Sequence, residues 1–144
     1  MFIYQSNGNL NPGIYDVDWK IFVEEFGFND HRKLLIGGLE LAIRELKMCG
    51  CKVMYIDGSF VSKKINPADY DACWDPSGVN YAYLKLKFPT LLDFRNERMY
   101  QKMKYKGEIF PATQIARPPK EIYMNFFQKD RDDNPKGIVK LTIS

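Results

Sequence analysis

Two acidic residues in an apolar run place the strongest constraint on what this chain can fold into. In residues 55–75, "YIDGSFVSKKINPADYDACWD", Asp69 and Asp71 flank Tyr70. Residues two apart on a strand project from the same face, so the pattern predicts a strand over 69–75 with both carboxylates on one side. Acids in an apolar run cost free energy unless they are paired or bind a cation. The pair therefore indicates either a cation site or the solvated face of a surface strand.

The residues ahead of this strand are suited to binding phosphate. A predicted strand over 52–57 ends at Gly58 and Ser59, and the loop that follows contains Lys63 and Lys64. Glycine allows a tight turn and a close approach of phosphate, while a serine hydroxyl and nearby amides can hold phosphate oxygens. The two lysines could neutralise a polyphosphate. The competing interpretation of Asp57-Gly58 is a simple hairpin turn.

Asp69 and Asp71 are also spaced for a divalent cation. Their carbons lie roughly 7 Å apart in an extended strand, so the two carboxylates can converge on one or two ions. Mg²⁺ prefers oxygen ligands and often uses one or two protein carboxylates together with substrate phosphates. We therefore expect Mg²⁺, or Mn²⁺ in its place, as the cofactor.

Helical and strand patterns alternate along the chain. The predicted helices are 19–26, capped by Asp16 or Asp18; one from Asn29 or Asp30 to a stop at Gly50; 95–105; and 119–128. The predicted strands are 52–57, 69–75, 90–94 and 138–143, the segment "NLNPGIYDVDWK" reads as a loop, and 81–87 fits either element. This order predicts an α+β or α/β fold, a small mixed β-sheet packed by helices, in one domain of residues 1–144.

Composition excludes several classes of protein. Hydrophobic residues make up 45% and aromatic residues 15% of the chain, which is too rich for wholesale disorder. The apolar runs are shorter than the ~18 residues that span a bilayer, and the N-terminus lacks the pattern of a secretory signal. Three cysteines without framework spacing favour a reducing compartment. We therefore expect a cytoplasmic protein with no membrane partner.

The segment 85–106 is locally basic. It carries seven basic residues against Asp93 and Glu97, namely Lys85, Lys87, Arg95, Arg98, Lys102, Lys104 and Lys106. This surplus could attract a phosphate-bearing partner, and the alternative is a solvated helix face. A second charged segment, "DRDDNPKG", mimics the opening of an EF-hand loop, but Pro135 stands where the sharp-turn glycine belongs. We predict that this second segment is a turn.

The spacing of the glycine, serine and acids resembles a known signature. An apolar residue, Gly58-Ser59, nine intervening residues and Asp69-Tyr70-Asp71 resemble the motif of the nucleotidyltransferase superfamily related to DNA polymerase beta. The longer pattern "DGSFVSKKINPADYDACWD", followed by "LLDF" and "GEIFPA", is similar to a family of short uncharacterised bacterial proteins grouped with that superfamily. The resemblance implies a nucleotidyltransferase-like fold.

The resemblance also implies a reaction and a third acid. Members of the superfamily transfer a nucleoside monophosphate from a nucleoside triphosphate to a hydroxyl, using two magnesium ions. Asp69 and Asp71 would then hold both ions, and a third carboxylate would come from a later strand. Asp93 in "TLLDF" is the first candidate, and Asp75 and Glu108 are its alternatives.

Two functions follow from this resemblance. The first is an enzyme that modifies an RNA, a protein or a small molecule. The second is a catalytically inactive relative that works by binding, such as an antitoxin beside a partner toxin. Because the chain of 144 residues holds little beyond a catalytic core, acceptor recognition would depend on a partner or a homodimer.

Overall fold

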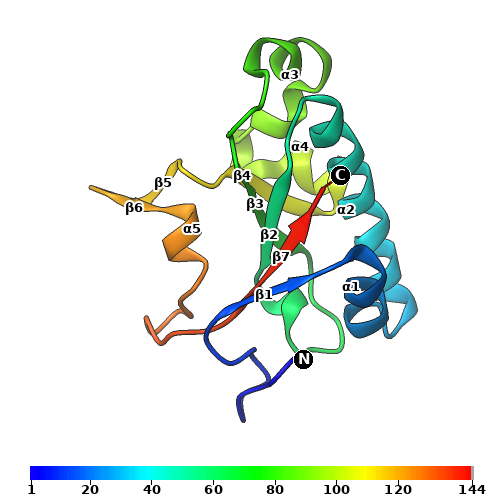
Figure 1. Ribbon diagram of the computed structural model, residues 1–144, viewed down its shortest axis with the longest axis vertical. Coiled ribbons are helices and arrows are strands. Elements are labelled where there is room, and N and C mark those ends of the chain that lie inside the picture. Colours follow the sequence, from blue (N-terminus) through cyan, green and yellow to red (C-terminus); the bar gives the residue numbers. More distant parts are fainter. Residues whose placement is uncertain (144) are drawn as a thin grey trace.

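The fold centres on a mixed five-stranded sheet (Figure 1). The computed structural model describes residues 1–143. The strand order is β1-β7-β2-β3-β4, with β1 parallel to β7, β3 parallel to β4, and β2 antiparallel to both of its neighbours. The bounds are β1 Ile14–Val17, β2 Val53–Asp57, β3 Tyr70–Trp74, β4 Gly107–Pro111 and β7 Ile138–Thr142; β5 Ile115–Arg117 and β6 Glu121–Ile122 form a separate hairpin. The expected α+β class with a small mixed sheet is confirmed.

The helices begin where the capping residues predict. The Asp18 carboxylate accepts the N–H of Ile21 at 2.8 Å, and the Asn29 side chain accepts the N–H of Arg32 at 2.8 Å. The helices are α1 Trp19–Phe26, α2 Asp30–Met48, α3 Tyr81–Lys87, α4 Arg95–Tyr105 and α5 Tyr123–Phe126, with 3₁₀ turns η1 Ser59–Val61 and η2 Pro89–Leu92. Within the described part of the chain, no helix is long and apolar enough to cross a membrane.

The two faces of the sheet bury different apolar clusters. Helices α1 and α2 lie along one face, and α5 with the β5-β6 hairpin lies on the other side (Figure 1). The larger cluster joins Met54, Ile56 and Ala72 of the sheet to α1 and α2. The smaller cluster, on the opposite face, contains Cys73, Phe110, Ala112, Phe127 and Ile138. Because side chains alternate along a strand, Asp57 and Asp71 belong to the face of the smaller cluster.

Three predicted elements are wrong. Residues 90–94 do not form a strand, because Pro89 opens a 3₁₀ turn there that ends before Asp93. The predicted helix 119–128 shrinks to α5, because β6 pairs with β5 and Pro118-Pro119 occupies the turn between them. The segment expected to be a loop contains β1, since "IYDV" pairs with β7 just after the Asn-Pro-Gly punctuation.

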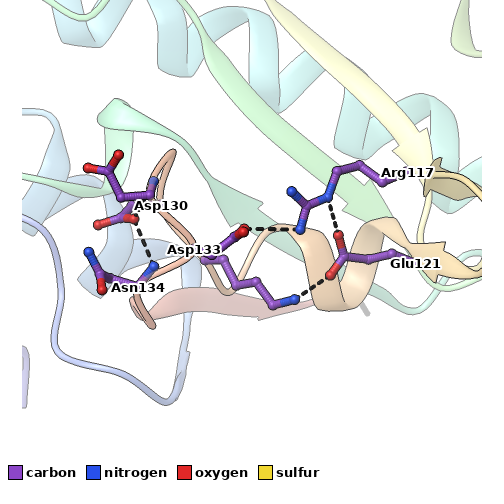
Figure 2. A network of polar contacts seen from close by, with 7 residues as sticks. Arg117, Glu121, Asp130, Asp133 and Asn134 are labelled. Carbon is purple, nitrogen blue, oxygen red and sulfur yellow. Dashed lines mark hydrogen bonds and ion pairs between the residues drawn. The ribbon is translucent and has the colours of Figure 1, made fainter.

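The EF-hand-like segment is a turn, as predicted. Asp130 Oδ1 accepts the backbone N–H groups of Asp132 and Asn134, each at 2.9 Å, so its carboxylate is used within its own loop. Figure 2 shows this turn beside ion pairs that join it to the β5-β6 hairpin. Arg117 contacts Glu121 at 2.6 Å and Asp133 at 3.0 Å. These pairs are exposed to solvent, which screens them, so they orient the hairpin more than they stabilise the fold.

Candidate functional site

Three neighbouring strands place acids in one row across the sheet. Asp57 on β2 is opposite Asp71 on β3, and Asp71 is in register with Glu108 on β4. Asp69 lies just ahead of β3 and shares the face of Asp71. One carboxylate oxygen from each of Asp69, Asp71 and Glu108 lies within 4.8 Å of the others. We call Asp69, Asp71 and Glu108 the acid cluster. Glu108 thus takes the place of the third carboxylate that was expected from a later strand.

The structure does not bring the first candidate for the third acid into this cluster. Asp93 lies at the end of η2, where its two oxygens accept Arg95 Nε at 3.0 Å and Arg95 Nη2 at 2.8 Å. The Arg95 hydrogen bonds lower the pKa of Asp93. Asp75, one of the two alternatives to Asp93, follows β3 and accepts the N–H of Ser77 at 2.9 Å. Both carboxylates serve local turns.

A sequence signal for Glu108 was present. A strand parallel to β3 requires a crossover connection, and the helix predicted over 95–105 is such a connection. The alternating segment directly after that helix is Gly107–Pro111, so its acid is the one that returns beside β3. Asp93 lies earlier in the chain and in an apolar segment, which is why the sequence pattern favours it over Glu108.

Burial and nearby negative charges raise the pKa values of Asp69 and Asp71, and burial raises that of Asp57. The pKa of Asp71 is raised well above its usual range, first by burial and then by the charges of Glu108, Asp57 and Asp69. Burial and the charge of Glu108 also raise the pKa of Asp69. Burial raises the pKa of Asp57 to about 6, although Lys136 Nζ lies 2.9 Å from its Oδ1. A divalent cation would relieve this repulsion.

The raised pKa values predict an unusual pH dependence of stability. Between about pH 4 and pH 6 the folded protein holds more protons on Asp57, Asp69 and Asp71 than the unfolded chain does. The free energy of unfolding should therefore fall as pH rises through this window. Asp57 alone, with its pKa raised from 3.8 to about 6, would contribute up to about 3 kcal/mol of this loss.

Thermal melts in EDTA between pH 4 and pH 7.5 test this prediction. The Asp93 carboxylate, whose pKa is lowered from 3.8, and the Glu121 carboxylate, whose pKa is lowered from 4.5, contribute stability that is present above these unfolded values and is lost as pH falls through the folded ones, so their effect is confined to the acid end of the window. The variant Asp71→Asn removes one of the titrating groups and should flatten the slope. A melting temperature that rises from pH 4 to pH 7 would contradict it.

Gly58 brings the backbone against the acid cluster. It adopts φ 83°, and a Cβ built there would lie 2.5 Å from Asp71 Oδ2. Only glycine tolerates both the backbone conformation and the close approach. The chain can then turn directly from β2 into η1, so that Ser59 follows the residue that contacts the carboxylate of Asp71.

Substituting Gly58 with alanine should disturb the site more than an ordinary helix substitution does. We expect Gly58→Ala to destabilise the fold by roughly 1–3 kcal/mol and to weaken cation binding, because the methyl group displaces the Asp71 carboxylate. Gly37→Ala in α2 is the control: nothing lies within 4 Å of its Cβ position, so it should stabilise by about 0.5–1 kcal/mol. Chemical unfolding and Mg²⁺ calorimetry measure both effects. Unchanged Mg²⁺ affinity in Gly58→Ala would contradict the proposed contact.

A buried arginine fixes the loop that follows Gly58. Arg32 in α2 is fully buried, and its guanidinium donates to the carbonyls of Phe60 at 2.7 Å, Ser62 at 2.9 Å and Lys64 at 2.7 and 3.0 Å. A further bond to Phe26 O at 2.9 Å brings all five N–H donors into use. Burial lowers its pKa to about 10, so the side chain keeps its charge at neutral pH. Helix α2 and the loop 58–64 are thereby held together.

Of the predicted phosphate-binding residues, Ser59, Lys63 and Lys64 line a pocket at this loop, whereas Gly58 does not. The pocket, of about 580 Å³, is formed by residues 4–9 together with Ser59, Ser62, Lys63 and Lys64. Lys63 Nζ lies 4.7 Å from the centroid of the Tyr4 ring, and both lysines are exposed. Among residues 1–143, two lysines and no acidic side chain line the pocket, so its charge suits an anion.

A short left-handed turn delivers a basic side chain to the acid cluster. Asn96, Glu97 and Arg98 have φ values of 51°, 55° and 62°, an arrangement that costs roughly 1–2 kcal/mol per residue. The Arg98 guanidinium contacts Glu108 Oε1 through Nε at 2.7 Å and through Nη2 at 2.7 Å. It also lies 5.7 Å from the centroid of the Phe110 ring. The sequence pattern predicted a plain helix here and gave no sign of this contact.

The donor set of the cluster fits a hard divalent cation. Asp69, Asp71 and Glu108 offer only carboxylate oxygens, the ligands that Mg²⁺ and Mn²⁺ prefer. Two oxygens on one Mg²⁺ lie about 3–4 Å apart, given the ~2.1 Å bond length. Oxygens already within 4.8 Å of one another can reach that spacing by side-chain rotation.

Comparisons with known proteins locate the chain in one family. No curated protein and no solved structure matches the chain. A family model described as "Family of unknown function (DUF6932)" matches residues 2–142. Since the match covers nearly the whole chain, the protein belongs to the DUF6932 family, whose function is unknown.

Proposed function

We propose that this protein is a metal-dependent nucleotidyltransferase that transfers a nucleoside monophosphate from a nucleoside triphosphate to a hydroxyl of an RNA, a protein or a small molecule. One observation carries the proposal. Three carboxylates from β3, the residue ahead of it and β4 converge within 4.8 Å, and the Gly58-Ser59 turn lies directly against them. The order of these parts is that of the nucleotidyltransferase signature described above.

Each part of the site has a role in such a transfer. Asp69, Asp71 and Glu108 would hold Mg²⁺ or Mn²⁺, which neutralises phosphate charge and lowers the pKa of the attacking hydroxyl. Ser59 would donate to phosphate oxygens beside the cluster, and Lys63 and Lys64 would balance the charge of the triphosphate in the adjoining pocket. The protein contributes chiefly by positioning groups and stabilising charge.

Incubation with labelled nucleoside triphosphates tests the proposal. Each of the four nucleotides, labelled at the α-phosphate, is combined with Mg²⁺ or Mn²⁺ and with candidate acceptors, including the protein itself and total RNA. Transfer of label and release of pyrophosphate, both abolished by EDTA, are the expected results. Calorimetry provides a second measurement, because cations should bind weakly alone and more tightly with a nucleotide. Absence of nucleotide-dependent cation binding at millimolar concentration would overturn the proposal.

The second candidate is an interaction protein that keeps the fold without the activity. The contact of Arg98 with Glu108 favours it, because an internal ion pair neutralises the third acid without any cation. Such a protein would bind a partner, for example a toxin or an RNA, through surfaces that do not depend on the acid cluster. Partner binding that survives Asp69→Asn with Asp71→Asn would support this candidate.

A further inference from the structure

Arg98 contacts the carboxylate of Glu108, one of the three groups that would bind a cation in the acid cluster. Two of its nitrogens, Nε and Nη2, lie 2.7 Å from the same oxygen, Glu108 Oε1. The charge of Arg98 also acts on Asp69, where it opposes the rise in pKa caused by burial and by Glu108. A cation that binds Glu108 through Oε1 displaces this guanidinium, and one that binds through Oε2 shares the carboxylate with it; in both cases the positive charges compete for the same group.

The backbone beneath Arg98 has a conformation that the contact helps to hold. None of the three left-handed residues, Asn96, Glu97 and Arg98, is glycine, so the turn is strained. The turn is fixed on one side by the bidentate Asp93–Arg95 pair and on the other by the Arg98–Glu108 pair. If the Glu108 carboxylate binds a cation, the Arg98–Glu108 restraint is lost. The backbone strain of residues 96–98 then favours a change in the conformation of this turn.

We propose that Arg98 is a positioning residue that alternates between two anionic partners: Glu108 in the cation-free protein, and the phosphates of the nucleotide once Glu108 binds a cation. The proposal rests on the proposed function, since it names a residue of the same site. A guanidinium presents a planar fork of donors that matches phosphate oxygens as well as carboxylate oxygens. The Arg98 side chain is 33% exposed, which leaves it a path toward a bound triphosphate.

The first test follows Arg98 directly. The Nε–H group of an ion-paired arginine gives an observable ¹⁵N–¹H NMR signal, and the Arg98→Lys variant assigns it by its absence. Titration with Mg²⁺ should shift or broaden this signal as the contact with Glu108 is lost. Addition of a non-hydrolysable α,β-methylene nucleoside triphosphate, with the four bases tested in turn, should then restore a sharp signal at a new position.

The second test measures two affinities in matched variants. Arg98→Met should bind Mg²⁺ about tenfold more tightly, because the cation no longer competes with the guanidinium. The same variant should bind the nucleotide analogue about tenfold more weakly at saturating Mg²⁺. Lys102→Met is the control, since its charge also acts on Asp69 but its side chain makes no contact with Glu108; both affinities should change less than threefold.

A third variant changes the backbone of the turn at an exposed residue. Glu97→Gly relieves the strain at one of the three left-handed residues, because glycine accepts a positive φ without a steric clash. It should favour the arrangement in which Arg98 contacts Glu108 and should weaken Mg²⁺ binding by roughly threefold to fivefold. This variant keeps every charge of the acid cluster and keeps Arg98, so it tests the proposal even if Arg98→Met fails to fold.

The outcomes separate this inference from the proposed function. Wild-type protein that binds no cation, with or without nucleotide, overturns the proposed function and the role of Arg98 with it. Wild-type protein that binds Mg²⁺ while the Arg98 signal stays unchanged overturns the role of Arg98 alone. Equal Mg²⁺ affinity in Arg98→Met and wild type leads to the same conclusion.

Discussion

The double substitution Asp69→Asn with Asp71→Asn should abolish nucleotidyl transfer and leave the fold as stable as before, or more stable. Asparagine keeps the size of the side chain but removes two negative charges from the acid cluster. The loss of these cation ligands should remove several kcal/mol of transition-state stabilisation, and each ~1.4 kcal/mol is tenfold in rate. Stability should hold or rise, because burial and like charges disfavour both carboxylates in the cation-free protein.

A melting curve and a transfer assay on the same preparation measure both effects. Asp30→Asn with Asp132→Asn is the matched control, since it removes two charges from exposed positions outside the cluster. The control should transfer nucleotide at the wild-type rate. A folded double variant that keeps full activity would exclude catalysis by this cluster. A double variant that unfolds would show that the two acids serve the structure.

Substitution of Arg32 should give the largest loss of stability among the single variants considered. Arg32→Met leaves the carbonyls of Phe60, Ser62 and Lys64 without their buried donor, and such unsatisfied groups cost about 1–3 kcal/mol each when water cannot reach them. Because the loop can partly relax toward solvent, we expect a total of about 3–5 kcal/mol. This corresponds to a fall of roughly 10–20 °C in the melting temperature.

Two companion variants show whether the charge of Arg32 or the geometry of its hydrogen bonds stabilises the loop. Arg32→Lys keeps the positive charge but has three donors instead of five, so it should recover only part of the stability. Arg44→Met removes the same charge from an exposed position in α2 and should change stability by less than about 0.5 kcal/mol. A loss below about 1 kcal/mol in Arg32→Met would show that the loop does not depend on this side chain.

Local patterns predicted much of the fold. Helical spacing and the caps Asp18 and Asn29 located α1 and α2, and alternation located β2, β3 and β7. These signals work because they depend on residues a few positions apart. The prediction failed where a distant partner decides the conformation, as in β1, which is a strand because β7 pairs with it.

Local patterns also predicted part of the candidate site, namely the residues that lie close together in the sequence. The pair Asp69 and Asp71 and the adjacent Gly58 come from one short segment, so their spacing alone indicated that they would lie together. Glu108 joins them through the register of β4 against β3; the crossover helix indicates that β4 returns beside β3, but no local spacing specifies this register. The contact of Arg98 depends on a left-handed turn of residues that individually favour a right-handed helix, so no sequence pattern indicates it.

The position of β7 has a consequence for the order in which the protein can be made. In the sheet, β7 lies between β1 and β2, yet the ribosome produces it after every other strand of that sheet. Until residues 138–142 have emerged, β1 has no neighbour, and β2 exposes a free hydrogen-bonding edge next to apolar residues. Free edges invite pairing with other chains, and contacts distant in sequence form slowly. The nascent protein therefore passes through a period in which chaperone protection matters most, and that period ends when a single late strand closes the sheet.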